Sequence, residues 1–273
     1  MRWRRFSILR MDPLLIVAGA CTGMLVGLTG VGGGALMTPL LLLFFGVAPV
    51  TAVGTDLWFA AITKLAATRV HHGHGLIDWQ VARRLWLGSL TASAVTLLWL
   101  TNAPADDAFV GTLRFWIAAA VVITAVGLLL QKPLHALGRR FRLADEARFK
   151  AMQGPLTVVA GAVLGTLVTL TSVGAGALGA IFLAYLYPFR LPPPRLIATD
   201  IVHAIPLAMF AGIGHLIIGN VNYVLLATLL VGSIPAVIVG AMLSARLPHT
   251  WLRVILAVVL AIIGLKLGFS AGH

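Results

Sequence analysis

Long apolar stretches separated by short polar gaps constrain the fold of this chain more than any other feature. Eight such stretches lie at about residues 12–45, 50–70, 77–101, 108–131, 155–187, 196–217, 222–245 and 251–270. Most have the roughly 20 residues that an α-helix needs to cross a bilayer core. No alternating pattern of about ten residues indicates a membrane β-barrel. The sequence therefore predicts an all-α, polytopic membrane protein with about eight to ten spans.

The composition excludes an ordinary soluble domain. Of the 273 residues, 60% are hydrophobic and only 10% are charged, whereas soluble domains average about 45–50% and about 25%. Lys and Arg number 20 against 8 Asp and Glu, a net charge of +12. These charges lie in the gaps between apolar stretches, as they do in cytoplasmic loops of membrane proteins. Nucleic-acid binding is not expected, because it needs a basic face with interleaved aromatic residues.

The single cysteine, Cys21, excludes an intramolecular disulfide and a metal site built from cysteines. Arginines precede the first apolar stretch, and Ala18-Gly19-Ala20-Cys21 is similar to a lipoprotein cleavage box. Cleavage there would cut through an internal repeat. We therefore predict an uncleaved first helix.

Two apolar stretches, 12–45 and 155–187, are too long for one crossing and short for two. Each is interrupted by a cluster of small residues. The clusters are Gly30-Val31-Gly32-Gly33-Gly34 and Ser172-Val173-Gly174-Ala175-Gly176. Glycine inside a helix costs roughly 1 kcal/mol relative to alanine, so such clusters break helices. We predict two short helices in each stretch, the second beginning near Ala35 and near Ala177.

The two halves of the chain repeat one another. A shift of 142 residues places Gly23 on Gly165 and the first glycine cluster on the second. After an insertion at Pro192-Pro193-Pro194 the shift becomes 144, which places Thr55-Asp56 on Thr199-Asp200. Duplicated helical units are common among secondary transporters. The predicted organisation is a first transmembrane repeat at 1–130, a basic cytoplasmic linker at 131–154 and a second repeat at 155–273.

Loop charges indicate that the two repeats are inverted. The loops at 69–84 and 188–195 carry arginines, whereas their equivalents at 216–221 and 46–50 are neutral. Basic loops stay on the cytoplasmic side, so inversion requires an odd number of crossings in each half. We predict five crossings in each. A nine-crossing alternative, in which 12–45 crosses once, would keep the Arg-rich N-terminus inside.

The glycine breaks are the first candidate binding site. A helix that begins inside the membrane presents free N–H groups and a positive dipole end, and glycine lets an anion approach them closely. The alternative is that the glycines only allow close helix packing. The candidate substrate-binding residues of the breaks are Gly30, Gly32, Gly33, Gly34, Ala35, Ser172, Gly174, Ala175 and Gly176.

Charged residues inside apolar stretches are the second candidate set. Lys64 lies six or more residues from the ends of its stretch. It is either a buried cation of an anion site or a snorkelling side chain. Asp56 and Asp200 each follow a threonine, so they either cap helices, or couple transport to protons or form hydrogen bonds between helices. His203 is either a proton relay or a hydrogen-bonded structural histidine.

Other features do not support catalysis or metal binding. His71, His72 and His74 have no carboxylate or cysteine partner nearby, so we interpret them as a solvated loop. Ser172 lacks a Gly-x-Ser-x-Gly motif. We expect no enzymatic activity, cofactor or bound metal.

The chain resembles the TauE/SafE family, the sulfite-exporter-like permeases that are grouped with toluene-sulfonate uptake proteins. The matching motifs run from Gly23 through the first cluster to Thr38-Pro39, and from Gly161 to Gly176. The later Thr-Asp pairs, Gly88-Ser89 and Gly232-Ser233 also match. The second cluster departs from the first at Ser172 and Ala175, so strict equivalence of the half-sites is not expected.

The resemblance implies transport of sulfur oxyanions and organic anions. The expected function is a secondary transporter that moves sulfite, a sulfonate or a carboxylate across a bacterial inner membrane, with protons as a possible coupling ion. A passive anion channel is the alternative. The expected partners are the small anionic substrate and the lipid bilayer, and the sequence leaves the oligomeric state open.

Overall fold

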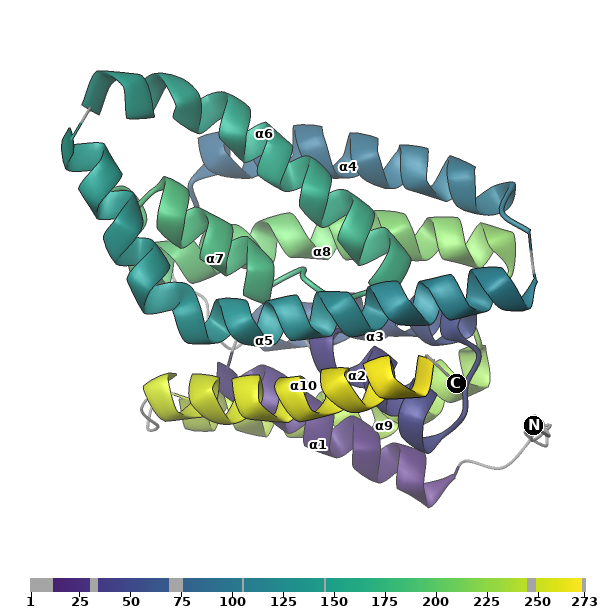
Figure 1. The fold of residues 1–273 in the computed structure, drawn as a ribbon. Helices are drawn as coiled ribbons and strands as arrows, with labels where there is room; N and C mark the ends of the chain where they lie inside the picture. The colour runs from purple at the N-terminus through teal and green to yellow at the C-terminus, as the bar shows by residue number, and fades with distance from the viewer. Residues whose placement is uncertain are drawn as a thin grey trace.

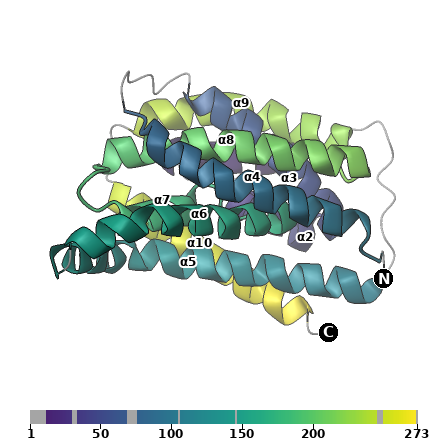
Figure 2. The ribbon, with the colours of Figure 1, turned by 90° about the horizontal axis from the view of Figure 1, so that it is seen from above.

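Ten α-helices, with long axes running roughly side by side, make up the described part of the chain (Figures 1 and 2). The computed structural model describes residues 12–29, 34–68, 76–104, 106–144, 146–244 and 249–271. The helices are α1 (Pro13–Thr29), α2 (Gly34–Phe44), α3 (Pro49–Thr68), α4 (Trp79–Thr101), α5 (Asp107–Ala144), α6 (Glu146–Thr171), α7 (Ala177–Leu186), α8 (Pro193–Ile218), α9 (Tyr223–Ser244) and α10 (His249–Ala271). By length and composition, α5, α6, α8 and α9 are able to cross a membrane, and further helices are apolar but shorter. The prediction of an all-helical membrane protein is confirmed at this level.

The predicted break of the second long apolar stretch is confirmed, and that of the first falls on residues outside the described part. In the first, α1 ends at Thr29 and α2 begins at Gly34, while residues 30–33 lie outside the described part. In the second, α6 ends at Thr171 and α7 begins at Ala177.

The backbone of the second break takes a conformation that a helix cannot continue. Its φ angle is 112° at Gly174 and 134° at Gly176, and it is 58° at Ser172. Positive φ is accessible to glycine without steric cost and uncommon for other residues. Glycine therefore allows α6 and α7 to form two separate helices.

Most of the polar segment 131–154 is helical. It is divided between the end of α5 and the start of α6. With 38 residues, α5 is about 57 Å long at the usual rise per residue. That length exceeds the roughly 30 Å of a bilayer core. Figure 1 shows the α5–α6 hairpin projecting past the ends of the other helices.

The two most extensive helix contacts each join a helix of the first half to a helix of the second. α1 packs most extensively against α9, and α4 packs against α6. The 142-residue shift places α1 on α6, and the 144-residue shift places α4 on α9, so the two contacts are equivalent in the repeat. Glycine permits both contacts, since a Cβ on Gly23 would lie 2.6 Å from the carbonyl oxygen of Ser233. A Cβ on the equivalent Gly165 would meet the backbone of Ser89. These two glycines outside the breaks thus serve close packing.

The repeat-related helices α3 and α8 contact each other and run antiparallel. The indole N–H of Trp58, in the middle of α3, donates to the carbonyl oxygen of Gly212, late in α8, over 3.0 Å. Two hydrogen bonds that the 144-residue shift relates to each other lie on either side of this contact. The Asn222 N–H donates to Oγ1 of Thr55 at 3.1 Å, and the Asp78 N–H donates to Oγ1 of Thr199 at 3.0 Å.

Candidate functional site

Asp56 is a buried hydrogen-bond acceptor in the middle of the bundle. Its Oδ2 accepts from the backbone N–H of Thr38 at 3.1 Å and from the Thr38 hydroxyl at 2.6 Å. Its Oδ1 is buried with no hydrogen-bond partner. The capping interpretation is wrong, because α3 begins at Pro49 and Asp56 lies two turns inside it. The carboxylate instead ties α3 to α2.

Lys64 lies two turns further along α3 and is only 4% exposed. Its ammonium group donates to the carbonyl oxygen of Ala175, inside the break between α6 and α7. The carboxylates of Asp200 and Asp56 lie within electrostatic range of it. Lys64 therefore does not snorkel to the surface. It brings a positive charge to the second glycine break.

Asp200 faces the same cluster from α8. It lies two turns after Pro193, the first residue of that helix, so the capping interpretation is wrong here too. Its Oδ1 is buried without a hydrogen-bond partner and lies against Gly179 of α7, where a Cβ would collide with it. The 142-residue shift places Thr38 on Ala180, which has no hydroxyl group. The two half-sites are therefore chemically different.

The second half also lacks an equivalent of Lys64. The 144-residue shift places Lys64 on Ala208. One ammonium group consequently lies among the two related carboxylates. In the break itself, the hydroxyl of Ser172 is buried without a hydrogen-bond partner, close to the Asp56 carboxylate. Unpartnered buried polar groups are rare in folded proteins and mark places where a ligand or water can bind.

The two buried histidines differ in their hydrogen bonding. Nε2 of His203 lies 3.0 Å from the Ser89 hydroxyl, while its Nδ1 is buried without a partner. His215 uses both ring nitrogens, toward the Thr169 carbonyl oxygen at 2.8 Å and the Asn220 amide at 3.3 Å. His215 is thus a structural histidine. His203 keeps one nitrogen unpartnered.

The structure brings most of the predicted site residues into one region. Asp56, Lys64, Asp200 and His203 come together with the second break. Ala35 in the first turn of α2 and Ala177 in the first turn of α7 belong to the same buried apolar cluster. Gly34 is the first residue of α2.

Some predicted residues lie outside the described part of the chain. They are Gly30, Gly32, Gly33, His71, His72 and His74. Within the ranges that the structure describes, no three His, Cys, Asp or Glu side chains are grouped to hold a metal ion.

Sequence reasoning missed Thr38 and Ser89 as members of this site. Both belong to motifs that identify the family resemblance, Thr38-Pro39 and Gly88-Ser89. A hydroxyl group beside a proline or glycine inside an apolar stretch was the available signal. The partners of these two hydroxyl groups could not be predicted from the sequence, because Asp56 and His203 reach them from other helices.

An ion pair joins the two halves at one end of the bundle. Asp78 caps the start of α4 and accepts two hydrogen bonds from Arg190, Nε to Oδ2 at 2.6 Å and Nη2 to Oδ1 at 2.9 Å. Burial acts to raise the pKa of Asp78, but hydrogen bonds from Arg190 and the Val81 N–H, with the charges of Arg190 and Arg195, hold it below its ordinary value. The pair therefore favours the folded chain at neutral pH.

Asp78→Asn is expected to lower stability near pH 7 by about 1 kcal/mol, since Arg190 is 41% exposed and water screens the pair. Asn keeps the helix cap, as Asn222 does for α9. A depressed pKa gives stability that is present above the ordinary aspartate value of about 3.9 and is lost as pH falls through the folded value. The difference between the two proteins should narrow below about pH 4. Thermal unfolding of both proteins in detergent, near pH 7 and below about pH 4, measures this difference in stability. A difference that grows in acid would contradict this account.

Comparison with known proteins places the chain among membrane transporters. Residues 15–267 match the model of the family described as Sulfite exporter TauE/SafE. The probable membrane transporter protein YjnA of Bacillus subtilis is 37% identical over 262 residues, covering 94% of this chain and 100% of its own. A second from that organism, YdhB, is 28% identical over 261 residues, with the same coverage. One from Methanocaldococcus jannaschii is 25% identical over 275 residues, covering 95% and 96%. No solved structure matches the chain.

Proposed function

Because the chain belongs to the sulfite exporter TauE/SafE family, we propose that it is a secondary transporter of a small anion. The proposed substrate is sulfite, a sulfonate or a carboxylate, carried across the bacterial inner membrane. The observation that carries this proposal is the buried ammonium group of Lys64 bound at the glycine break before α7. An isolated buried cation is costly, and such residues in membrane proteins usually serve function.

The start of α7 supplies the second half of the proposed anion site. Its first residue, Ala177, follows Gly176, which makes no side-chain cap. Free N–H groups at a helix start, together with the helix dipole, favour an anion. The carbonyl oxygen bound by Lys64 lies only two residues before α7. An oxyanion placed there would meet an ammonium group, helix N–H groups and the unpartnered Ser172 hydroxyl.

We propose that protons accompany the anion. With Asp56, Asp200 and Lys64 all ionised, this cluster carries a charge of −1 and repels an anion. One proton on either carboxylate makes it neutral, and two give it a positive charge. Anion binding would therefore favour protonation of the cluster. Asp56, Asp200 and His203 are the proposed coupling residues.

We further propose that the halves are inverted in the membrane and exchange access by rocking. The antiparallel contact of α3 with α8 supports this proposal. The charge distribution agrees, because Asp78, Arg190 and Arg195 gather at one end of the bundle. The loops near Thr55 and Asn222 lie at the other. By the positive-inside rule the basic end faces the cytoplasm.

Anion-evoked currents in proteoliposomes test this function. Sulfite, alkyl sulfonates and small carboxylates are applied to the purified full chain on a solid-supported membrane, with and without a pH gradient. The expected result is a saturable current for one anion class that changes with the pH gradient. Currents that never saturate and ignore the gradient would instead indicate a passive anion channel.

A further inference from the structure

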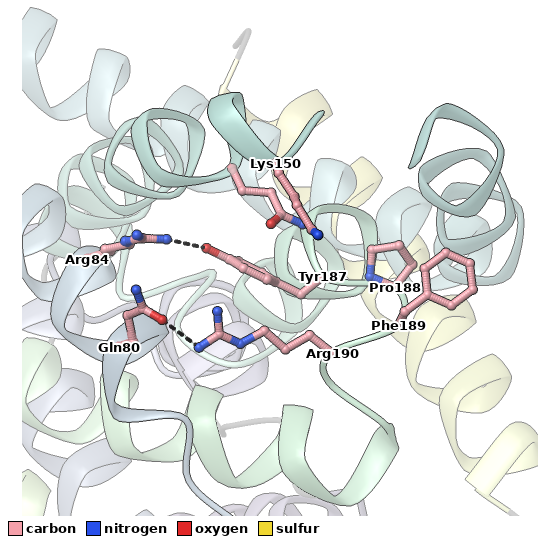
Figure 3. A pocket seen from close by; sticks show the side chains of 8 residues that line it. Gln80, Arg84, Lys150, Tyr187, Pro188, Phe189 and Arg190 are labelled. Carbon is pink, nitrogen blue, oxygen red and sulfur yellow. Dashed lines mark hydrogen bonds between the residues drawn. The ribbon is translucent and has the colours of Figure 1, made fainter. Parts of the chain in front are cut away.

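A pocket outside the central site opens at the basic end of the bundle (Figure 3). Its volume is about 450 Å³. Three elements build it, namely α4, the start of α6 and the loop after α7. The polar residues that line it are Gln80, Arg84, Lys150, Gln153, Tyr187 and Arg190. The transport mechanism proposed above uses none of them.

Two of the pocket's cations have different surroundings. The guanidinium group of Arg190 is bound to Asp78 and to the Gln80 side-chain oxygen, the latter at 2.7 Å. In contrast, the guanidinium group of Arg84 reaches only the phenol oxygen of Tyr187, at a long 3.4 Å. Among the residues that the structure describes, no carboxylate pairs with Arg84. Its charge is therefore not balanced within the pocket.

A buried tyrosine forms the wall beside Arg84. Tyr187 is only 1% exposed, and its hydroxyl lies 2.7 Å from the Thr157 hydroxyl in α6. Gly154 lies beside the guanidinium group of Arg84, whose central carbon would be in van der Waals contact, at 3.5 Å, with a Cβ there. In Figure 3 the side chains of Arg84, Lys150 and Arg190 surround the Tyr187 ring. The pocket thus presents hydrogen-bond donors and the unbalanced positive charge of Arg84.

This donor set fits a phosphate group. A guanidinium group binds phosphate through paired N–H donors, and a lysine adds a compact positive charge. Basic pockets between membrane helices on the cytoplasmic side recognise phosphate headgroups in the same way. The pocket's edge also carries Phe189, which is 52% exposed and has Arg139 of α5 over its ring at 5.2 Å. An exposed aromatic ring beside basic residues suits a membrane interface.

We propose that this pocket binds a phosphate group, supplied by an anionic phospholipid headgroup or by free phosphate. The bound phosphate joins α4 of the first half to α6 and the α7–α8 loop of the second. Binding there stabilises the contact between the halves at the basic end. The proposal does not depend on transport or on Lys64.

The test compares Arg84→Gln with the adjacent control Arg83→Gln. Both variants lose one positive charge from α4, but only Arg84 lines the pocket. In one arm, inorganic phosphate is titrated against the full chain in detergent at constant ionic strength, and thermal unfolding reports binding. In the other, native mass spectrometry measures retained phosphatidylglycerol, with phosphatidylcholine as the neutral reference. Arg84→Lys, which keeps the charge and loses the paired donors, is the second pocket variant.

The expected result is binding at least tenfold weaker in Arg84→Gln, several-fold weaker in Arg84→Lys and unchanged in Arg83→Gln. Selective loss of phosphatidylglycerol without a phosphate response supports the lipid headgroup as the source. A phosphate response lost with Arg84 supports free phosphate. Equal weakening in Arg83→Gln and Arg84→Gln, or no binding of either probe to the wild type, would overturn the proposal.

Discussion

Replacing Lys64 with methionine is expected to lower the rate of anion transport at least a hundredfold, a change of about 2.7 kcal/mol. Methionine keeps the length of the side chain but removes the ammonium group that contacts Ala175. The carboxylates of Asp56 and Asp200 then lie in the bundle without a cation, and they repel an incoming anion. The initial rates of anion-evoked transport in proteoliposomes measure the effect.

Two further variants make the Lys64 result interpretable. Lys266→Met is the same substitution at an exposed position of α10, where the ammonium group lies over the Phe44 ring, and it should transport normally. Removing one partner of a buried ion pair is strongly destabilising. The double variant Lys64→Met with Asp200→Asn removes one negative charge together with the positive one, and we expect it to fold without transporting. Normal transport by Lys64→Met would exclude Lys64 from the site.

Gly23→Ala is expected to destabilise the folded chain by about 2–3 kcal/mol or more. The added Cβ would lie 2.6 Å from the carbonyl oxygen and 2.8 Å from the Cα of Ser233. Both atoms are backbone, so α1 and α9 must move apart. Unfolding in mixed detergent micelles, followed by circular dichroism, gives the change in free energy.

Gly111→Ala is the matched control for the Gly23 variant. Gly111 also lies inside a helix, α5, but a Cβ there would meet nothing within 4 Å. The same substitution should leave stability unchanged or raise it by up to about 1 kcal/mol, because alanine is the better helix former. Equal losses in both variants would show that the α1–α9 contact does not require glycine.

The broken helices were predictable because their signal is local. Glycine clusters interrupt both apolar stretches, and the break that the structure describes, between α6 and α7, lies at the second cluster. Lys64 was recognised for a similar reason, since a charge in the middle of an apolar stretch has few structural uses. The equivalence of Thr55 with Thr199 came from the repeat, and the two hydrogen bonds that they accept are also equivalent.

The environments of Asp56 and Asp200 were not predictable from local patterns. A Thr-Asp pair near the start of an apolar stretch is typical of a helix cap. The helices in fact begin earlier, at Pro49 and Pro193, and proline favours the first turn of a helix. Both carboxylates therefore point into the bundle, where tertiary packing decides their partners.

The pocket around Arg84 was likewise not visible in the sequence. Arginines in a membrane-protein loop usually indicate orientation alone. Arg84 and Tyr187 are 103 residues apart, and they meet because α4 packs against α6 and Tyr187 contacts Thr157 of α6. Such a pocket depends on helix contacts and not on a motif.

Tracer counterflow tests the central claim most directly. Proteoliposomes containing the full chain are loaded with the anion that gives the largest current, and a trace of the same labelled anion is added outside. An alternating-access transporter exchanges the two, so we predict that label accumulates transiently above its equilibrium level and that Lys64→Met abolishes this peak. A simple approach to equilibrium without a peak, in protein shown to be folded, would contradict the proposed mechanism.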